Sequence, residues 1–370
     1  MSTSPDNPTG RPAPRPSGRL RRLAAPFVHP PAFDFWASRL HRTWSWQRPL
    51  ARIVAREAAS SDAVTLVLKP NRHWRGFAPG QHVNLGVEVD GIRLTRSYSL
   101  CDVPRRDGRI AITVKAVDGG KVSRHLHANA RVGDVLDIGP AFGALALPAD
   151  NEPVLLLAAG SGITPLMALL RQHAARGMPS PITLLYWSRR REQHCYTDEL
   201  RALAAMHPRF DLHLVLTGEA AFTGDEAQGR IDATLLSTLA PDFAQRHVLA
   251  CGPGGFVDTA RALCADARSF DAESFSPPPR TVEDTGTATV TLARSGRTLD
   301  VPRGQSLLEA LEAHGLKPAS GCRMGICNTC ACGKSEGSTR HRHTGDIEHE
   351  PVSALRLCIN SAAGDLVLDL

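Results

Sequence analysis

Four cysteines near the C-terminal end of the 370-residue chain have a spacing that suits an iron–sulfur centre. They form a C-x4-C-x2-C run followed by a distant fourth residue, namely Cys322, Cys327, Cys330 and Cys358. This spacing is typical of the thiolate ligands of a [2Fe–2S] cluster. Gly321 and Gly325 lie in the same loop, where they permit tight turns that let backbone N–H groups point at the sulfurs. The loop is therefore a predicted metal site.

Two other interpretations of this region are disfavoured. Structural zinc sites usually combine two C-x2-C pairs, and this loop has one. A Rieske centre would use histidines in place of two cysteines; the basic stretch 340–343 holds two histidines, but four cysteines are already available. The fifth cysteine, Cys332, is predicted to be a neighbour of the cluster, with substitution for a ligand as the alternative.

A glycine turn in the middle of the chain has the form of a phosphate site. The segment Gly160-Ser161-Gly162-Ile163-Thr164-Pro165 follows the apolar strand predicted at 154–159 and opens a helix predicted at 165–176. Glycines permit close approach of a pyrophosphate, and a helix N-terminus offers unpaired N–H groups with a positive dipole. The alternative is a tight strand–helix connection with no ligand.

Three patterns of secondary structure must position these groups. From about residue 50 to 147, short alternating strands are separated by Gly, Pro and Asp, which predicts an antiparallel barrel or sandwich. After residue 151, strands alternate with helices, which predicts a parallel, doubly wound sheet. Beyond residue 287, two short strands and a helix precede the cysteine loop, and a closing strand follows at 365–369.

Two further motifs connect these patterns to a family. Arg96-Ser97-Tyr98-Ser99 lies on a predicted barrel strand, and Cys251-Gly252-Pro253-Gly254-Gly255-Phe256 follows a predicted strand of the parallel sheet. In this order, residues 50–275 resemble the ferredoxin–NADP reductase superfamily, and residues 287–370 resemble plant-type ferredoxin domains. The resemblance implies a multidomain fold: an antiparallel β-barrel flavin domain, an α/β doubly wound nicotinamide domain and an α+β, β-grasp-like ferredoxin domain.

The resemblance also implies residue roles. Tyr98 would stack on the flavin ring system, Ser99 would hydrogen-bond near its reactive nitrogen, and Arg96 would pair with the flavin pyrophosphate. Ser99, Cys251 and Glu273 are the implied catalytic residues, with Cys251 beside the nicotinamide ring. The remaining implied cofactor-binding residues are Ser97, Gly119, Gly120, Val122, Ser123 and the shielding aromatic Phe275 for the flavin, and Gly160, Gly162, Thr164, Pro165, Gly252 and Pro253 for the nicotinamide dinucleotide.

The same motifs favour particular cofactors. The turn at 119–123 resembles FAD-type members of the family more than FMN-type ones, so FAD is expected. Ser188, Arg189 and Arg190 follow the strand predicted at 182–187, where arginine can hydrogen-bond a 2′-phosphate, which favours NADPH. The nearby Glu192 keeps NADH as the alternative, and a solvated basic loop is the interpretation without a ligand.

Composition excludes several classes of protein. With 42% hydrophobic and 22% charged residues the chain is in the globular range, and no apolar run reaches the roughly 18–20 residues of a membrane span. The net charge of +6 is concentrated in an arginine-rich N-terminal arm, without the basic, aromatic-interleaved face expected of a nucleic-acid binder. No secretory signal is recognisable, and clustered cysteines without one favour metal chemistry in a reducing cytoplasm.

Residues 33–46 carry three of the five tryptophans among basic side chains. An amphipathic segment on a membrane surface has this composition. The competing interpretation, which the sequence favours slightly, is a helix whose aromatic side chains pack on the next domain.

The expected organisation is a basic arm plus a Trp-rich segment at 1–46, with residues 1–32 disordered. An FAD-binding barrel at 47–149, a nicotinamide domain at 150–275, a linker at 276–287 and a ferredoxin domain at 288–370 follow. Together the modules imply an enzyme that passes electrons from NADPH to FAD to [2Fe–2S] to an oxygen-activating non-haem iron partner. The N-terminal segment resembles reductases of membrane-bound acyl desaturases, which implies a cytoplasmic protein with peripheral contact at the inner membrane face. The alternatives are an NADH-dependent reductase of a soluble Rieske or di-iron oxygenase and, from another class, a redox-sensing interaction protein.

Overall fold

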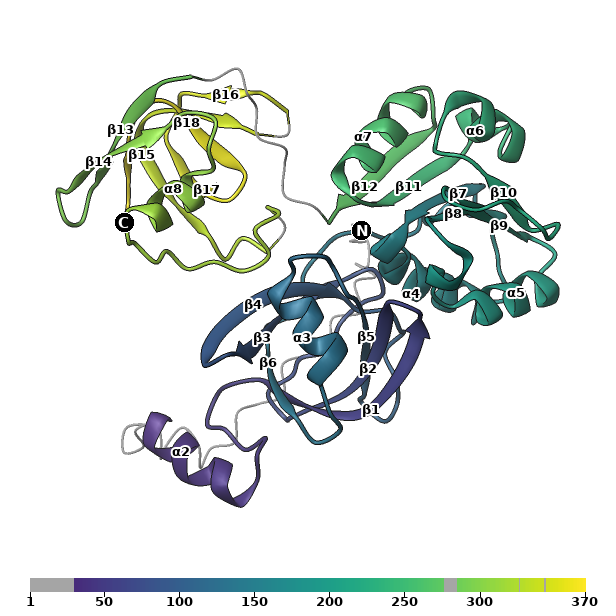
Figure 1. The fold of residues 1–370 in the computed structure, drawn as a ribbon, viewed down its shortest axis with the longest axis horizontal. Helices are drawn as coiled ribbons and strands as arrows, with labels where there is room; N and C mark the ends of the chain where they lie inside the picture. The colour runs from purple at the N-terminus through teal and green to yellow at the C-terminus, as the bar shows by residue number, and fades with distance from the viewer. Residues whose placement is uncertain (1–29, 276–284, 326, 343) are drawn as a thin grey trace, which may run out of the picture.

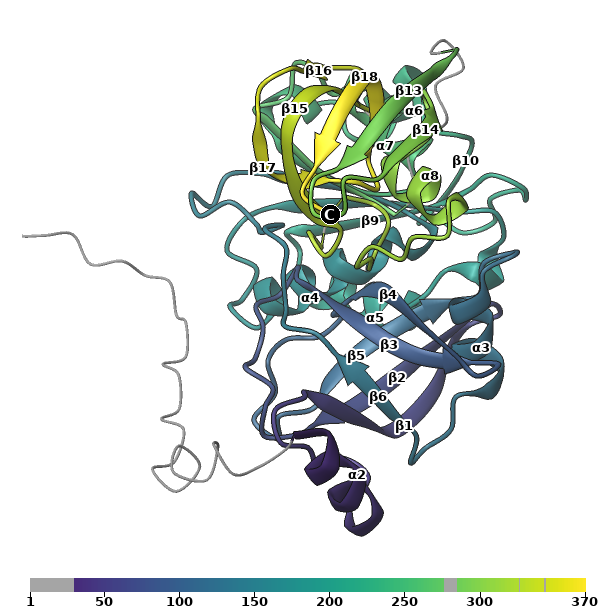
Figure 2. The same cartoon turned by 90° about the vertical axis from the view of Figure 1, so that its left-hand side faces the viewer.

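A computed structural model of the chain describes residues 30–275, 285–325, 327–342 and 344–370. Three sheets of six strands each build three lobes, which Figure 1 shows separately. In both views the barrel lobe lies between helix α2 (Pro30–Leu40) and the other two lobes (Figure 2). The expected disordered arm at 1–32 falls almost entirely outside the described residues, as does most of the expected linker at 276–287.

The first lobe is an antiparallel sheet in the order β4-β3-β6-β1-β2-β5. An antiparallel bridge between Leu100 and Ile112 joins the two edges, so the sheet closes into a barrel. Apolar residues at every second position of β3 are buried inside it, as the period of two requires. The strands are β1 (Leu50–Ser60), β2 (Ala63–Pro70), β3 (His82–Val89), β4 (Ile92–Ser99), β5 (Ile110–Lys115) and β6 (Val135–Ile138), and helix α3 (Lys121–Asn129) packs across β3, β4 and β5.

The second lobe is a parallel sheet in the order β10-β9-β8-β7-β11-β12. Strands β7 and β8 are buried over their whole length because helices cover both faces of the sheet. The strands are β7 (Val154–Ala159), β8 (Ile182–Ser188), β9 (Phe210–Leu216), β10 (Glu226–Gln228), β11 (His247–Gly252) and β12 (Ser269–Ser274). The helices are η2 (Gly160–Gly162), α4 (Ile163–Ala174), η3 (Arg191–Gln193), α5 (Thr197–Met206), α6 (Ala233–Leu239), η4 (Phe243–Gln245) and α7 (Gly254–Leu263).

The third lobe is a mixed sheet in the order β14-β13-β18-β15-β16, with β17 also paired to β15. Helix α8 (Leu307–Ala313) begins at Ser306, whose hydroxyl accepts a hydrogen bond from the Glu309 backbone, and it buries a leucine face on the sheet. The strands are β13 (Thr287–Leu292), β14 (Thr298–Pro302), β15 (Ala331–His341), β16 (Ile347–Glu348), β17 (Val352–Arg356) and β18 (Asn360–Leu368). The expected fold class is confirmed in all three lobes, although the sequence patterns do not predict β15, β16 and β17.

Polar contacts fix the barrel against the α/β lobe. Arg171 on α4 donates to the backbone oxygen of Cys101 at 2.6 Å and lies over the ring of Tyr196. The Tyr196 hydroxyl in turn meets Thr113 on β5. These contacts place the glycine turn that follows β7 beside the barrel.

The N-terminal segment is partly packed and partly exposed. Phe33 and Trp46 pack edge to face with centroids 5.2 Å apart, a contact within the segment itself. By contrast, Trp36 is 67% exposed and Trp44 is 53% exposed. The segment at 33–46 therefore packs only some of its aromatic side chains. Among the described residues, no helix is long and apolar enough to cross a membrane.

Candidate functional site

The cysteine loop gathers its sulfurs as two pairs. Cys322 and Cys327 are hydrogen-bonded to each other through their side chains, and so are Cys330 and Cys358. Three of the four residues are buried, and Cys327 is partly exposed. Cys330 directly precedes β15, and Cys358 lies between β17 and β18, so the sheet fixes the position of the second pair. The loop brings together all four cysteines that the spacing singles out.

Backbone amides of the loop point at sulfur. The N–H groups of Met324 and Cys327 approach the Cys322 sulfur at 3.3 and 3.4 Å, and the N–H of Cys322 approaches the Cys327 sulfur at 3.3 Å. A hydrogen bond from Cys322, with others from Thr329, lowers the pKa of Cys327 to about 4. A hydrogen bond from Cys358 lowers the pKa of Cys330 to about 7. One thiol of each pair is thus stabilised as the thiolate, which is the form that binds metal.

This donor set fits a [2Fe–2S] cluster. Among the described residues, no three His, Cys, Asp or Glu side chains converge tightly enough to hold a single metal ion. Two thiol pairs with amide donors suit two irons, each with two cysteine ligands, better than one tetrahedral zinc ion. Cys332 lies on β15, where its thiol donates to the oxygen of Gly333 at 3.5 Å and joins neither pair. Burial raises the pKa of Cys332 to about 12.

Strand β4 places the four expected flavin-binding residues in a row. Antiparallel pairing sets Ser97 opposite Asn84 and Ser99 opposite His82. Burial raises the pKa of the Tyr98 hydroxyl, so the ring presents a neutral phenol. Partial burial, together with the nearby positive charge of Arg323, lowers the pKa of Arg96.

The guanidinium of Arg96 retains donors for a ligand. One of its nitrogens donates to the backbone oxygen of Thr95 at 2.7 Å. A guanidinium carries five N–H donors and stays protonated in proteins, so the others can meet a phosphate. A partly exposed arginine and an aromatic ring on one strand therefore fit a flavin with its phosphates.

A second turn lies at the start of α3. Gly119 has φ +72° with open space around it, and a Cβ on Gly120 would lie 2.5 Å from the Ser123 hydroxyl. Ser123 accepts from the backbone N–H of Val117 at 3.3 Å, and Val122 is buried beneath the helix. The first backbone amides of α3 lack a side-chain cap and are free to meet a phosphate.

The glycine turn after β7 packs against the end of β11. A Cβ on Gly162 would lie 1.9 Å from the oxygen of Cys251, and one on Gly252 would lie 3.0 Å from the Cβ of Ala159. Only glycine allows this approach, which brings the Gly160–Pro165 turn and the Cys251–Pro253 segment together. The strand order reverses between β7 and β11, where open α/β sheets form their ligand crevice. The geometry fits a dinucleotide.

Side chains in this crevice are held by hydrogen bonding or by burial within the protein. The Thr164 hydroxyl donates to the oxygen of Ser161 at 2.9 Å, and Pro165 is buried in the first turn of α4. Cys251 is fully buried, and burial raises the pKa of its thiol well above the ordinary value. Cys251 is therefore a neutral thiol and is not a nucleophile.

The arginines after β8 divide into two groups. Arg191 is held by Glu226 at 2.5 Å and by Glu219 at 3.4 Å, so it supports the loop. Arg189 and Arg190 are exposed next to Ser188, which is buried and has a hydroxyl without a hydrogen-bond partner. Arg190 has an exposed ion pair with Glu192 at the long distance of 3.9 Å, so both exposed arginines can still turn to an anionic ligand.

His82 belongs to the site although the sequence analysis did not single it out. Its Nε2 lies 2.9 Å from an oxygen of Glu273 on β12. Its ring is stacked on Phe142, with centroids 5.8 Å apart, and meets Phe275 edge-on at 6.1 Å. Glu273 and Cys251 are in register on neighbouring strands. Glu273 and Phe275 therefore contact one histidine at the boundary of two lobes, with Ser99 paired to it on β4 and Cys251 next to Glu273.

Comparisons with protein families match all three lobes. Residues 50–146 match the oxidoreductase FAD-binding domain, residues 156–262 the oxidoreductase NAD-binding domain, and residues 290–359 the 2Fe-2S iron-sulfur cluster binding domain. FAD, a nicotinamide cofactor and a [2Fe–2S] cluster are thereby supported. When bound, the nicotinamide supplies a hydride, the cluster takes single electrons, and the flavin connects the two.

Relatives extend over nearly the whole chain. An NADPH oxidoreductase of Mycobacterium tuberculosis is 35% identical over 95% of this chain and 92% of its own length. The glycine betaine monooxygenase reductase subunit of Pseudomonas aeruginosa is 30% identical over 89% of this chain and 97% of its own length. Among solved structures, phthalate dioxygenase reductase superposes with a TM-score of 0.59 at 25% identity, covering 87% of this chain and 97% of the other.

Proposed function

Because the chain belongs to the ferredoxin–NADP reductase superfamily, in the form that carries a C-terminal [2Fe–2S] ferredoxin domain, we propose that it is the reductase component of an oxygen-activating system. It takes electrons from NADPH, passes them through FAD and the cluster, and delivers them singly to a non-haem iron partner. The site residues take the roles that the family resemblance implies, and the five segments expected from the sequence are its functional units.

One observation carries this proposal. Thr329, in the cysteine loop, touches Asn84 on β3, and Asn84 is paired in register with Ser97 on β4. The metal-binding loop therefore lies directly on the strand pair that the family uses for the flavin. Relatives named as reductase subunits of a monooxygenase and a dioxygenase support an oxygenase as the acceptor.

The proposed preference for NADPH rests on Arg189 and Arg190. Both are exposed at the carboxyl end of β8, whereas Arg191 is held by two carboxylates. A 2′-phosphate next to the adenosine ribose would accept charge-assisted hydrogen bonds from these side chains. The name of the NADPH oxidoreductase relative supports the same choice.

The proposed partner is a membrane-bound acyl desaturase, reached through the N-terminal segment on the cytoplasmic side. Phe35, Trp36 and Leu40 on α2 are exposed, and Arg39 lies 3.6 Å from the centroid of Phe35. Aromatic and basic side chains on one short helix suit an interfacial position at an anionic membrane. Because α2 lies at the end of the barrel away from the ferredoxin lobe (Figures 1 and 2), such contact leaves the cluster loop uncovered.

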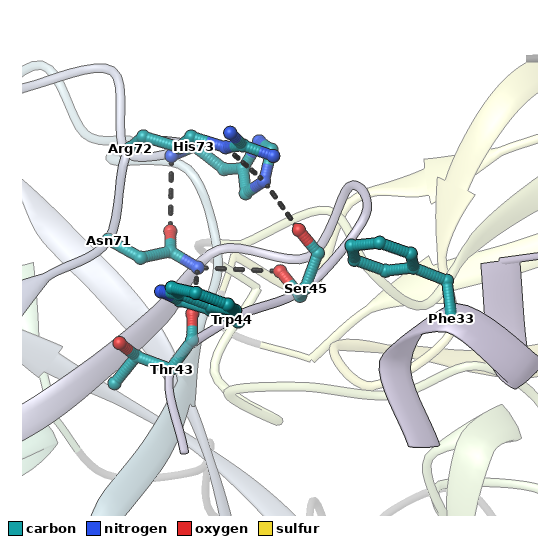
Figure 3. Close-up of a pocket in the computed structure, with 7 residues that line it drawn as sticks. All are labelled: Phe33, Thr43, Trp44, Ser45, Asn71, Arg72 and His73. Carbon is teal, nitrogen blue, oxygen red and sulfur yellow. Dashed lines mark hydrogen bonds between the residues drawn. The ribbon is translucent and has the colours of Figure 1, made fainter. Parts of the chain in front are cut away.

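A cavity lies next to the segment that carries the exposed Trp44. It has a volume of about 400 Å³ and lies between residues 43–45 and residues 71–73 (Figure 3). Asn71 holds this segment in place by donating to the oxygens of Thr43 and Arg48, both at 3.0 Å. These hydrogen bonds therefore hold Trp44 at the surface.

A soluble oxygenase is the second candidate for the acceptor. The names of the cited relatives favour it, because they specify a monooxygenase and a dioxygenase and do not mention a membrane enzyme. In this case the exposed face of α2 would contact the oxygenase itself.

Steady-state turnover tests the proposed reaction. Purified holoprotein is mixed with cytochrome c as a one-electron acceptor, and the rate is measured with NADPH and with NADH. We expect turnover with both donors and a higher kcat/KM with NADPH. Failure to turn over with either donor would contradict a reductase and favour a redox-sensing role, whereas a preference for NADH would contradict only the donor.

A further inference from the structure

We infer that Asn84 is the positioning residue that docks the ferredoxin domain on the flavin domain and joins the flavin-binding strand to a cluster ligand. The inference rests on the proposed function and deepens it. Its basis is a pair of hydrogen bonds that runs from Ser97 through Asn84 to Thr329, whose side chain lies beside the sulfur of Cys327.

The backbone of Asn84 is fixed on both sides. Strand pairing sets it opposite Ser97 on β4, and its carbonyl oxygen accepts from the N–H of Gly139 at 2.8 Å. A Cβ on Gly139 would come within 3.4 Å of the Asn84 Cβ, so the two chains lie close together. Asn84 therefore presents its side chain from a rigid part of the barrel.

The side-chain amide is oriented by its first partner. The Ser97 hydroxyl lies 2.6 Å from Oδ1 of Asn84 and donates to it. This leaves the NH2 group of Asn84 facing Thr329, whose hydroxyl oxygen accepts at 3.3 Å. An amide has one acceptor oxygen and two N–H donors, so both contacts are satisfied in this orientation.

Thr329 continues the chain to the metal site. A Cβ on Gly321 would lie 2.9 Å from the Thr329 hydroxyl oxygen and 2.8 Å from the Cys327 sulfur, so these two groups are neighbours. Because the oxygen of Thr329 accepts from Asn84, its own O–H can be directed at that sulfur. The hydrogen bonds from Ser97 to Asn84 and from Asn84 to Thr329 run in the same direction, from the flavin strand to the cysteine loop. Hydrogen bonds in such a chain polarise and strengthen one another.

Two neighbours show where the loop lies. A Cβ on Gly321 would lie 3.3 Å from the amide nitrogen of Asn84 and 2.8 Å from the Cys327 sulfur, so glycine leaves the room that Asn84 occupies. Arg323, next to Cys322, lies near Arg96 on β4, and this proximity of like charges, after burial, lowers the pKa of Arg96 without stabilising the contact. Arg323 is itself held by Glu312 at 2.6 Å. The loop is thus seated on β3 and β4 together.

The contact matters because domain interfaces within a chain are mobile unless specific contacts fix them. The covalent connection keeps the ferredoxin domain near the others, but proximity alone does not set its orientation. Electron transfer slows steeply as two redox centres move apart, so a change in domain orientation lowers its rate. Asn84 supplies the orientation, because its one side-chain amide is hydrogen-bonded to both domains.

The test is an anaerobic stopped-flow experiment on Asn84→Ala holoprotein, with Asn129→Ala as the matched control. Asn129 is exposed at the end of α3, away from the loop. After mixing with NADPH, flavin bleaching should stay within about twofold of wild type, while bleaching of the cluster slows by about tenfold or more. The electron paramagnetic resonance spectrum of the dithionite-reduced cluster should be unchanged, and small-angle X-ray scattering should show a larger maximum dimension.

A second set of variants covers the case in which Asn84→Ala loses flavin. Thr329→Val removes the same contact from the other domain and should slow cluster bleaching similarly, whereas Thr329→Ser should restore it. The double variant with Asn84→Ala should be no slower than Thr329→Val alone, since that change already removes the contact that Asn84→Ala removes. Cluster bleaching within twofold of wild type in Thr329→Val, or additive effects in the double variant, would overturn the inference. Loss of flavin bleaching in wild type would instead contradict the proposed function.

Discussion

On β3 and β12, the Nε2 atom of His82 and a carboxyl oxygen of Glu273 lie 2.9 Å apart across the boundary between the barrel and the α/β lobe. Their side chains are only 3% and 11% exposed. The pair therefore joins two lobes through groups that water scarcely reaches. Phe142 and Phe275 flank the imidazole on either side, so the pair also fixes the aromatic residue expected to shield the flavin.

Removing one partner of this pair should be costly. His82→Ala leaves the buried carboxyl group of Glu273 without its partner, and such a change typically destabilises a protein by about 1–3 kcal/mol. Urea unfolding at neutral pH should show this loss. The double variant His82→Ala, Glu273→Gln should lose less stability than the sum of the two single variants, because both changes remove one contact; additive losses would contradict a coupled pair.

Cys327→Ser should remove the cluster and spare the flavin. A serine hydroxyl cannot replace the thiolate that the loop stabilises, so the visible iron–sulfur absorption should disappear. Flavin bleaching by NADPH should continue at a rate close to that of wild type, because the barrel and the α/β lobe are untouched. Cys332→Ser is the control, and loss of the cluster in that variant would contradict the assignment of the four ligands.

Arg189→Ala and Arg190→Ala should reduce the preference for NADPH. Each change removes hydrogen bonds to a phosphate worth about 1.5–3 kcal/mol, which corresponds to roughly 10- to 100-fold in kcat/KM. The kcat/KM for NADH should change little. Equal losses with both donors would instead show that these side chains support the loop. Arg209→Ala, an exposed arginine at the other end of the sheet, serves as a control.

Stability should fall at acid pH through Glu226. Hydrogen bonds from Arg191 lower the pKa of this carboxyl to about 2, from an ordinary value near 4.5. A depressed pKa in the folded state stabilises the protein above the unfolded value, and this stability is lost as pH falls from about 5 toward 2. Thermal melting of Glu226→Gln between pH 7 and 3 should lack this component. A wild-type-like pH dependence in the variant would contradict it.

The exposed face of α2 should bind anionic vesicles. Trp36→Ser and Leu40→Ser remove apolar side chains that are 67% and 80% exposed, so co-sedimentation with phosphatidylglycerol vesicles should weaken several-fold while turnover of cytochrome c persists. Phe222→Ser is the matched control, since Phe222 is 80% exposed on the α/β lobe. Unchanged sedimentation of the α2 variants would contradict the membrane contact and favour a soluble partner.

The sequence predicts the parts of this protein that depend on local spacing. The cysteine ligands lie within one short loop plus Cys358, and the glycine turn lies between β7 and α4, so both follow from neighbouring residues. The alternation of strands and helices likewise predicts the parallel sheet. The exposed Trp36 is different, because the same composition suits a packed helix and a surface helix.

Contacts between lobes were outside the reach of such patterns. His82 and Asn84 occupy ordinary positions in an alternating strand, and nothing local indicates that they meet Glu273 and Thr329. The polar residues of β3 carried the available signal, because a histidine at a buried position of a strand needs a partner. Arg191 is another example: it follows Arg189 and Arg190 in the chain, and nothing local indicates that two distant carboxylates hold it.

The most direct test of the relay is an anaerobic visible-absorption titration of the holoprotein with NADPH. The account predicts that the flavin and iron–sulfur bands both bleach at low NADPH. Bleaching of the flavin while the iron–sulfur band stays oxidised would contradict the passage of electrons from flavin to cluster within one chain.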